Sequence, residues 1–144
     1  MLGAHAVKRS TFASALMLLV VGGCAGSPVT ADGVTLLRSG FLMGSPAALN
    51  SGTMDFSTGC VVLDQGGIGG ERYVVIWPSG TTFERVDDVL SVVVGDLAIH
   101  DGDVLSLGGG AYKGRAEVEG LTGSIPSVCL ADRYWLATSV EHLD

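Results

Sequence analysis

The feature that most constrains the fold is a pair of short strand-forming runs separated by a glycine-rich loop. Residues 60–63 (CVVL) and 72–77 (RYVVIW) are dominated by β-branched and aromatic side chains, which favour extended structure. The stretch between them, 64–71 (DQGGIGGE), contains four glycines and predicts a hairpin loop. Short strands of this kind bury their apolar faces only by pairing into a larger sheet, so the pattern predicts an all-β domain.

Similar runs continue along the chain. Further extended segments are predicted at 34–43, 81–85, 89–94, 103–107 and 133–140. In the last of these, Tyr134 and Trp135 begin an alternation that would place successive side chains on opposite faces of a sheet. We predict no amphipathic helix of ordinary length, and we expect 42–57 to be a loose segment. Short strands with frequent turn signals predict one domain over 34–144, a five- to seven-stranded barrel or sandwich with an OB-like barrel among the options.

The N-terminal region has the composition of an export signal. Lys8 and Arg9 supply positive charge without any acidic residue nearby, and the apolar run 12–21 (FASALMLLVV) follows. This run is too short to cross a bilayer, which requires about 20 apolar residues. It does fit the basic and apolar regions of a secretory signal peptide.

The run ends in Val21-Gly22-Gly23-Cys24, which resembles the lipobox of bacterial lipoproteins, although Leu is more usual at the position of Val21. The resemblance implies a signal peptide over 1–23 and a diacylglyceryl group, with a further acyl chain such as palmitate, on Cys24. It further implies a lipid-anchored protein on the extracytoplasmic side of the cell membrane. We expect the lipidated N-terminus and a flexible tether to occupy 24–33.

Lipidation of Cys24 would leave two cysteines, Cys60 and Cys129. An even number of cysteines in an exported protein predicts a disulfide. Two buried free thiols are the alternative if the chain is not exported.

The charge excludes some partners. The chain has eight basic and fifteen acidic residues, a net charge of −7. Loss of Lys8 and Arg9 with the signal peptide leaves six basic residues and a net charge of −9. We therefore expect no nucleic-acid partner, because nucleic-acid binding depends on Lys and Arg at the phosphates. Attachment to the membrane would depend on the lipid anchor rather than on surface charge.

The motif that most resembles a catalytic or metal site is 99–103 (IHDGD). In this motif, His100, Asp101 and Asp103 could bind a metal or form a hydrolytic site. Asp-Gly is also a strong hairpin-turn signal, and we favour the turn. The glycines at 66–70 and 108–110 lack the strand-loop-helix context of a phosphate-binding loop and predict turns or bulges. His142 lies in a charged C-terminal tail that we expect to be solvated. We expect neither a metal site nor a cofactor.

Large aromatic residues supply the remaining candidate site. Trp77, Trp135 and Tyr73 could form an exposed platform for a glycan or a partner protein, or they could fill the core of a small barrel. We favour the core.

These observations predict a membrane-anchored, non-enzymatic binding or scaffolding module with an envelope protein or glycan as partner. The second strand, the Trp77-Pro78 corner and the 101–110 segment resemble small β-domain lipoproteins of GC-rich bacteria. The alternative function is an envelope hydrolase that uses carboxylates or a metal near His100.

Overall fold

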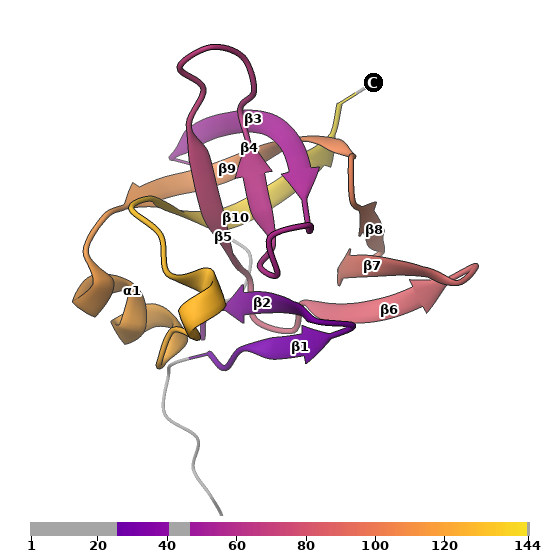
Figure 1. The fold of residues 1–144 in the computed structure, drawn as a ribbon, viewed down its shortest axis with the longest axis horizontal. Coiled ribbons are helices and arrows are strands. Elements are labelled where there is room, and N and C mark those ends of the chain that lie inside the picture. The colour runs from indigo at the N-terminus through magenta and orange to yellow at the C-terminus, as the bar shows by residue number, and fades with distance from the viewer. Residues whose placement is uncertain (1–25, 41–46, 144) are drawn as a thin grey trace, which may run out of the picture.

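The computed structural model describes residues 26–40 and 47–143, most of which lie in strands (Figure 1). The elements are β1 (Val29–Ala31), β2 (Val34–Arg38), β3 (Ala48–Asp55), β4 (Val62–Asp64), β5 (Arg72–Trp77), β6 (Thr82–Val86), β7 (Val89–Val94), β8 (Leu97–His100), β9 (Val104–Tyr112), α1 (Arg115–Thr122), the 3-10 turn η1 (Ser127–Cys129) and β10 (Tyr134–His142). The predicted signal peptide and Cys24 lie outside the described residues. In the described ranges, no helix has both the length and the apolar character needed to cross a bilayer.

Five strands form a closed barrel. β3, β4 and β5 are successive antiparallel neighbours, and β9 returns to pair with the other edge of β3. β10 lies between β9 and β5, antiparallel to the former and parallel to the latter, which closes the barrel. A fourth strand beside the first of a three-strand meander is a Greek key, and a five-stranded Greek-key barrel is the architecture of the OB-fold. The prediction of a small all-β barrel is confirmed.

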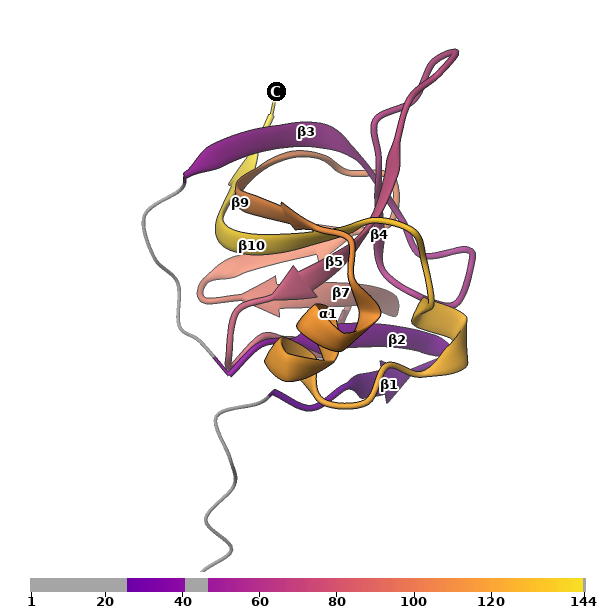
Figure 2. The same ribbon diagram turned by 90° about the vertical axis from the view of Figure 1, so that its left-hand side faces the viewer.

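Strand alternation on β5 divides the apolar residues between two cores. Tyr73, Val75 and Trp77 point into the barrel and form part of the inner core, together with residues of β3, β4, β9 and β10. Val74 and Ile76 belong to a separate outer core on the other face of the strand. This outer core is covered by α1 and η1, which lie beside the barrel (Figure 2).

A second, three-stranded sheet is inserted between β5 and β9. Its order is β6-β7-β8, with all neighbours antiparallel. Val92, Val94 and Ile99 from this sheet are buried in the inner core. The sheet therefore extends the barrel's own hydrophobic core.

The predicted disulfide is present and joins Cys60 to Cys129 across 69 positions of sequence. Both cysteines are buried in the outer core, where Cys60 lies two residues before the start of β4 and Cys129 ends η1. The bond fastens the segment before β10 to the barrel wall. The predicted disulfide is thus confirmed.

The expectation of a flexible tether through residue 33 is wrong for its described part. β1 pairs with β2 through a turn at Asp32 and Gly33, whose φ angles of 51° and 75° are those of a type I′ hairpin. The Gly26 N–H donates a hydrogen bond to the Leu121 carbonyl of α1 at 3.1 Å. The Asp-Gly pair at 32–33 is a local signal for this hairpin. The prediction of a tether did not take this signal into account.

Two further expectations differ from the structure. The segment expected to be loose contains β3, whose residues pair with β9 and then with β4, so tertiary pairing rather than local propensity sets its conformation. An unpredicted helix, α1, opens at Arg115 and buries Val118 and Thr122, one turn apart. Eight residues give too short a periodic pattern to distinguish a helix from a loop.

The glycine tracts behave as predicted. The 66–70 tract lies in the loop of the β4–β5 hairpin, and the 108–110 tract lies within β9. At Gly109, φ is 150° and an added Cβ would lie 1.7 Å from the Leu136 carbonyl oxygen. The β9–β10 register shifts beside this point, between Ala137 and Ser139. The glycine therefore permits a bulge and a close approach of two strands.

Candidate binding groove

A groove runs between the β4–β5 hairpin and the segment that precedes β10. It consists of two adjoining hollows of about 180 Å³ and about 590 Å³, which share Arg72 and Ala131. The smaller hollow is lined by Thr58, Val62, Arg72, Val74, Val128, Leu130 and Ala131. The larger is lined by Gly69, Gly70, Glu71, Arg72, Ala131, Asp132 and Arg133.

The smaller hollow is largely apolar because it lies at the uncovered edge of the outer core. Val62 and Val74 are members of that core, whereas Val128 and Leu130 are 44% and 45% exposed. Exposed aliphatic side chains beside a concave surface are typical of a contact site. The smaller hollow thus offers an apolar contact surface at the edge of the fold.

The wall that carries Val128 and Leu130 is fixed at several points. Cys129 between them is held by the disulfide and donates its N–H to the Pro126 carbonyl at 2.9 Å. The Tyr134 hydroxyl donates to the Cys129 carbonyl and accepts from the Ala131 N–H, at 3.1 and 2.9 Å. The wall is therefore ordered by tertiary contacts although it belongs to a connecting segment.

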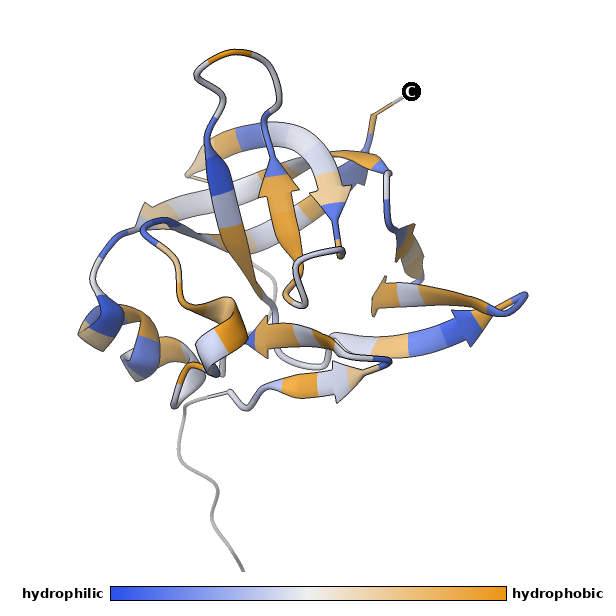
Figure 3. Ribbon diagram, in the orientation of Figure 1, coloured by the Kyte–Doolittle hydropathy of each residue, from blue (hydrophilic) through white to orange (hydrophobic). Residues whose placement is uncertain are grey.

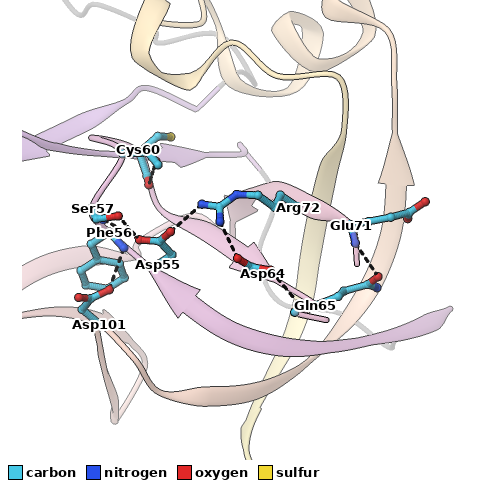
Figure 4. Close-up of polar contacts among 11 residues, drawn as sticks. Asp55, Phe56, Ser57, Cys60, Asp64, Gln65, Glu71, Arg72 and Asp101 are labelled. Carbon is cyan, nitrogen blue, oxygen red and sulfur yellow. Dashed lines mark hydrogen bonds and ion pairs between the residues drawn. The ribbon is translucent and has the colours of Figure 1, made fainter. Parts of the chain in front are cut away.

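An ion-paired arginine lies where the two hollows meet (Figure 4). Arg72 Nη2 lies 2.6 Å from Asp55 Oδ2, and Nη1 lies 2.5 Å from Asp64 Oδ2. The Ser57 hydroxyl donates to Asp55 Oδ1 at 2.6 Å, and this bond together with the Arg72 guanidinium lowers the pKa of Asp55 to about 2. Both terminal nitrogens of Arg72 are thus already engaged by carboxylates.

The larger hollow is polar, and its lining carries two acidic and two basic side chains. Arg133 Nη1 pairs with Glu71 Oε1 at 2.9 Å. The other Glu71 oxygen accepts a hydrogen bond from the Tyr73 hydroxyl, which raises the pKa of Tyr73. Asp132 is exposed and forms no ion pair or hydrogen bond with any residue that the structure describes. The rim therefore carries a free negative charge.

The groove occupies the position at which barrels of this architecture bind ligands. In OB-folds the ligand lies on the second and third barrel strands, between the loop joining the first two strands and the loop joining the last two. The corresponding elements here are β4, β5, the loop at 56–61 and the connection at 113–133. Thr58 comes from the first of these loops and Leu130 from the second.

The structure places the predicted aromatic platform in the interior. Trp77, Trp135 and Tyr73 are 0%, 6% and 7% exposed and belong to the inner core. The Tyr73 and Trp135 rings meet edge to face with centroids 5.9 Å apart. An exposed platform is therefore wrong for these residues, and the alternative that they fill the core is confirmed.

The turn predicted at Asp101 and Gly102 is present, but it does not form a hairpin. The Asp103 N–H donates to the His100 carbonyl at 3.2 Å, and Asp103 Oδ2 accepts from the His100 N–H at 2.8 Å. The flanking strands β8 and β9 belong to different sheets. Asp101 also accepts a bond from the Phe56 N–H at 2.9 Å, as Figure 4 shows. The segment is a corner that links the two sheets.

His142 is exposed, as expected, but it is the last residue of the paired strand β10 rather than part of a tail. Its Nε2 lies 3.1 Å from the Ala98 carbonyl oxygen and 4.0 Å from Asp103 Oδ2. His100 Nδ1 lies 3.5 Å from the same Asp103 oxygen. Among the described residues, no three His, Cys, Asp or Glu side chains are arranged to hold a metal.

Sequence reasoning did not identify the groove residues. Val128 and Leu130 are isolated aliphatic residues in a connection, and Arg72 and Arg133 lie far apart in the chain. The only local signal was the position of Val128 and Leu130 on either side of a predicted disulfide cysteine, Cys129.

Comparisons with protein-family models, curated proteins and solved structures found no match.

Proposed function

We propose that this protein is a non-enzymatic binding module of the cell envelope, anchored to the membrane through lipid on Cys24. The observation that carries the proposal is the groove between β4–β5 and the segment before β10. It combines exposed aliphatic walls with ordered charged groups at the usual ligand position of this barrel.

The charges in the groove favour binding over acid–base chemistry. Arg72 and Arg133 each form ion pairs with carboxylates, and these ion pairs fix the shape of the surface. The lowered pKa of Asp55 makes it a weak base near neutral pH. A general base in catalysis works best with a pKa near the working pH, which is the opposite of the shift at Asp55.

The position of the N-terminus agrees with display of the β4–β5 hairpin away from a membrane. Gly26 is bonded to α1 and follows Cys24 by two residues, so a lipid on Cys24 would hold the α1 end of the domain close to the bilayer. The β4–β5 hairpin extends from the opposite end of the molecule (Figures 1 and 2). Its tip is apolar (Figure 3) and carries the fully exposed Ile68.

Site-specific photocrosslinking in cells tests the groove. A photoreactive residue would replace Leu130 in the full-length protein, with a matched replacement at Leu49. Leu49 is an exposed leucine, 72% accessible, that lines neither hollow. We expect discrete crosslinked species from position 130 and only background from position 49. Equal labelling at the two positions would show that the groove has no special role in contact.

The anchor is tested separately by the intact mass of the protein extracted from its own membranes. We expect the mass of residues 24–144 plus acyl groups. A Cys24→Ser variant should lose the acyl mass and leave the membrane fraction. An unmodified full-length mass for the native chain would refute the anchor and leave the groove test unaffected.

A further inference from the structure

We infer that the groove binds an extended segment of a partner protein in which a basic and an aliphatic side chain lie two positions apart, on the same face of the segment. This inference rests on the proposed function and adds the chemistry of the partner. Three features of the groove carry it: its charge balance, the size of its apolar hollow and the open strand edge at its floor.

The charge balance favours a cation. The charged groups in and bordering the groove are Arg72, Arg133, Asp55, Asp64, Glu71 and Asp132, which gives two positive charges against four negative ones. An anionic ligand would have to compete with the carboxylates that already bind both arginines. A basic side chain finds Asp132 exposed at the rim and needs to displace nothing. Complementary charge of this kind raises the rate of association and selects the partner.

The apolar hollow fits one aliphatic side chain. Its volume is about 180 Å³, and Val128 and Leu130 stand on one side with Val62 and Val74 on the other. Because the disulfide and Tyr134 fix the wall, little conformational entropy is lost when the hollow is filled. Arg72 and Ala131 line both hollows. Two side chains at alternate positions of one extended chain lie on the same face and could therefore occupy the two hollows together.

The floor of the groove has an open strand edge that suits a peptide better than a small cation. β5 begins at Arg72, but its first residue paired with β10 is Val74, which lies opposite Tyr134. The Val74 N–H already donates to the Arg133 carbonyl at 3.1 Å, so Arg72 is the residue of β5 that has a strand neighbour on the β4 side only, within the paired strands that the structure describes. An extended peptide can pair with such an edge through its main chain while its side chains enter pockets.

The test uses two synthetic peptides and the full-length protein carrying Cys24→Ser. One peptide repeats the pattern Lys-Thr-Leu-Thr, which places lysine and leucine two positions apart on one face, and the other replaces each lysine by glutamate. Binding is followed by amide chemical shifts and by fluorescence anisotropy of labelled peptide at two salt concentrations. We expect the basic peptide to shift amides at 58, 72–74 and 130–133, with weaker binding at higher salt. We expect no such shifts with the acidic peptide.

Variants locate the effect. Asp132→Asn should weaken binding of the basic peptide by about two- to five-fold, the range for an exposed ion pair. Asp96→Asn removes an exposed carboxylate that lines neither hollow and should leave binding unchanged. Leu130→Ser should weaken binding of both peptides, if any is measurable, and Leu49→Ser should not.

The outcomes separate the two proposals. Equal binding of both peptides in the groove would overturn the charge preference and keep the groove as a binding site. Shifts at the groove with an oligosaccharide or a short oligonucleotide, and none with either peptide, would overturn the peptide as occupant. Shifts elsewhere or none at all, together with equal crosslinking at positions 130 and 49, would overturn the groove itself.

Discussion

Leu36 and Leu37 are neighbours on β2 and are both fully buried, yet they belong to different cores. Leu36 packs with the inner core, which the closed barrel and the inserted sheet surround with strands. Leu37 packs with the outer core, which is covered by one short helix and a connecting segment. One side of the sheet is therefore enclosed by strand pairing, and the other depends on how the cover is attached.

The difference explains where the groove lies. Strand pairing closes the inner core on every side of the barrel, so it leaves little apolar surface for a partner. The cover of the outer core ends at η1, where the disulfide holds it, and Val62 and Val74 lie at its edge beside the exposed Val128 and Leu130. The outer core, covered by one helix and a connecting segment, thus supplies both an apolar contact surface and an ordered wall.

Loss of the disulfide should have the largest effect. Replacement of Cys60 and Cys129 by alanine should lower the free energy of unfolding by about 4 kcal/mol, since the bond closes a long loop in the unfolded chain. In hydrogen exchange, amides at 127–133 should lose protection before those of β9 and β10. The measurement is denaturant unfolding, with Cys24→Ser as control because it leaves the bond intact. Uniform loss of protection across both cores would contradict the difference between them.

The leucine pair should give the next largest effect. We expect Leu36→Ala to lower the free energy of unfolding by about 4 kcal/mol and Leu37→Ala by about 2–3 kcal/mol, within the range for buried leucines. The inner site is surrounded by paired strands and cannot collapse around the cavity, whereas the cover of the outer site can shift. Each variant is compared by urea unfolding with and without the disulfide. The effects of Leu37→Ala and of disulfide loss on the free energy of unfolding should not add, because both changes act on the cover of the outer core, whereas those of Leu36→Ala and disulfide loss should add. Equal departures from additivity at the two positions would contradict the difference between the cores.

The acid sensitivity of the groove should be the smallest effect on stability. The folded pKa of Asp55 is lowered from 3.8 to about 2, so its stabilising contribution is present above pH 3.8 and is lost as the pH falls toward 2. The shift corresponds to at most about 2.5 kcal/mol, and solvent screening at the half-exposed Arg72 should reduce it to about 1 kcal/mol. Asp55→Asn should lower stability at pH 7, and the curves of variant and parent should converge near pH 2. Parallel curves over this range would contradict the assignment.

Local residue patterns were enough to predict much of the fold. The β-branched runs at 60–63 and 72–77, with four glycines between them, led to the β4–β5 hairpin. Strand alternation from Tyr134 to Ala137 was also correct, because Tyr134 lies in the outer core and Trp135 and Ala137 in the inner one. Beyond the register shift between Ala137 and Ser139 the alternation is displaced, and Val140 packs against the inner core. These features depend on neighbours in the chain, which a sequence displays directly.

The errors arose where distant segments decide the structure. The local sequence of β3 predicts a loop. The segment forms a strand because β9 and β4 pair with it. The local sequence around His142 predicts a charged tail. Only the pairing of β10 places His142 near Asp103. Neither local propensity nor charge carries information about such partners.

The sequence by itself determined the all-β class, the hairpin with its glycine loop, and the disulfide pair. Closure of the barrel, division of the apolar residues into two cores and assembly of the groove were decided only by the tertiary structure. The physical reason is the distance along the chain over which each interaction acts. Strand alternation and turn chemistry act over a few residues, whereas the groove joins Thr58, Arg72 and Leu130 through strand pairing and a bond between Cys60 and Cys129.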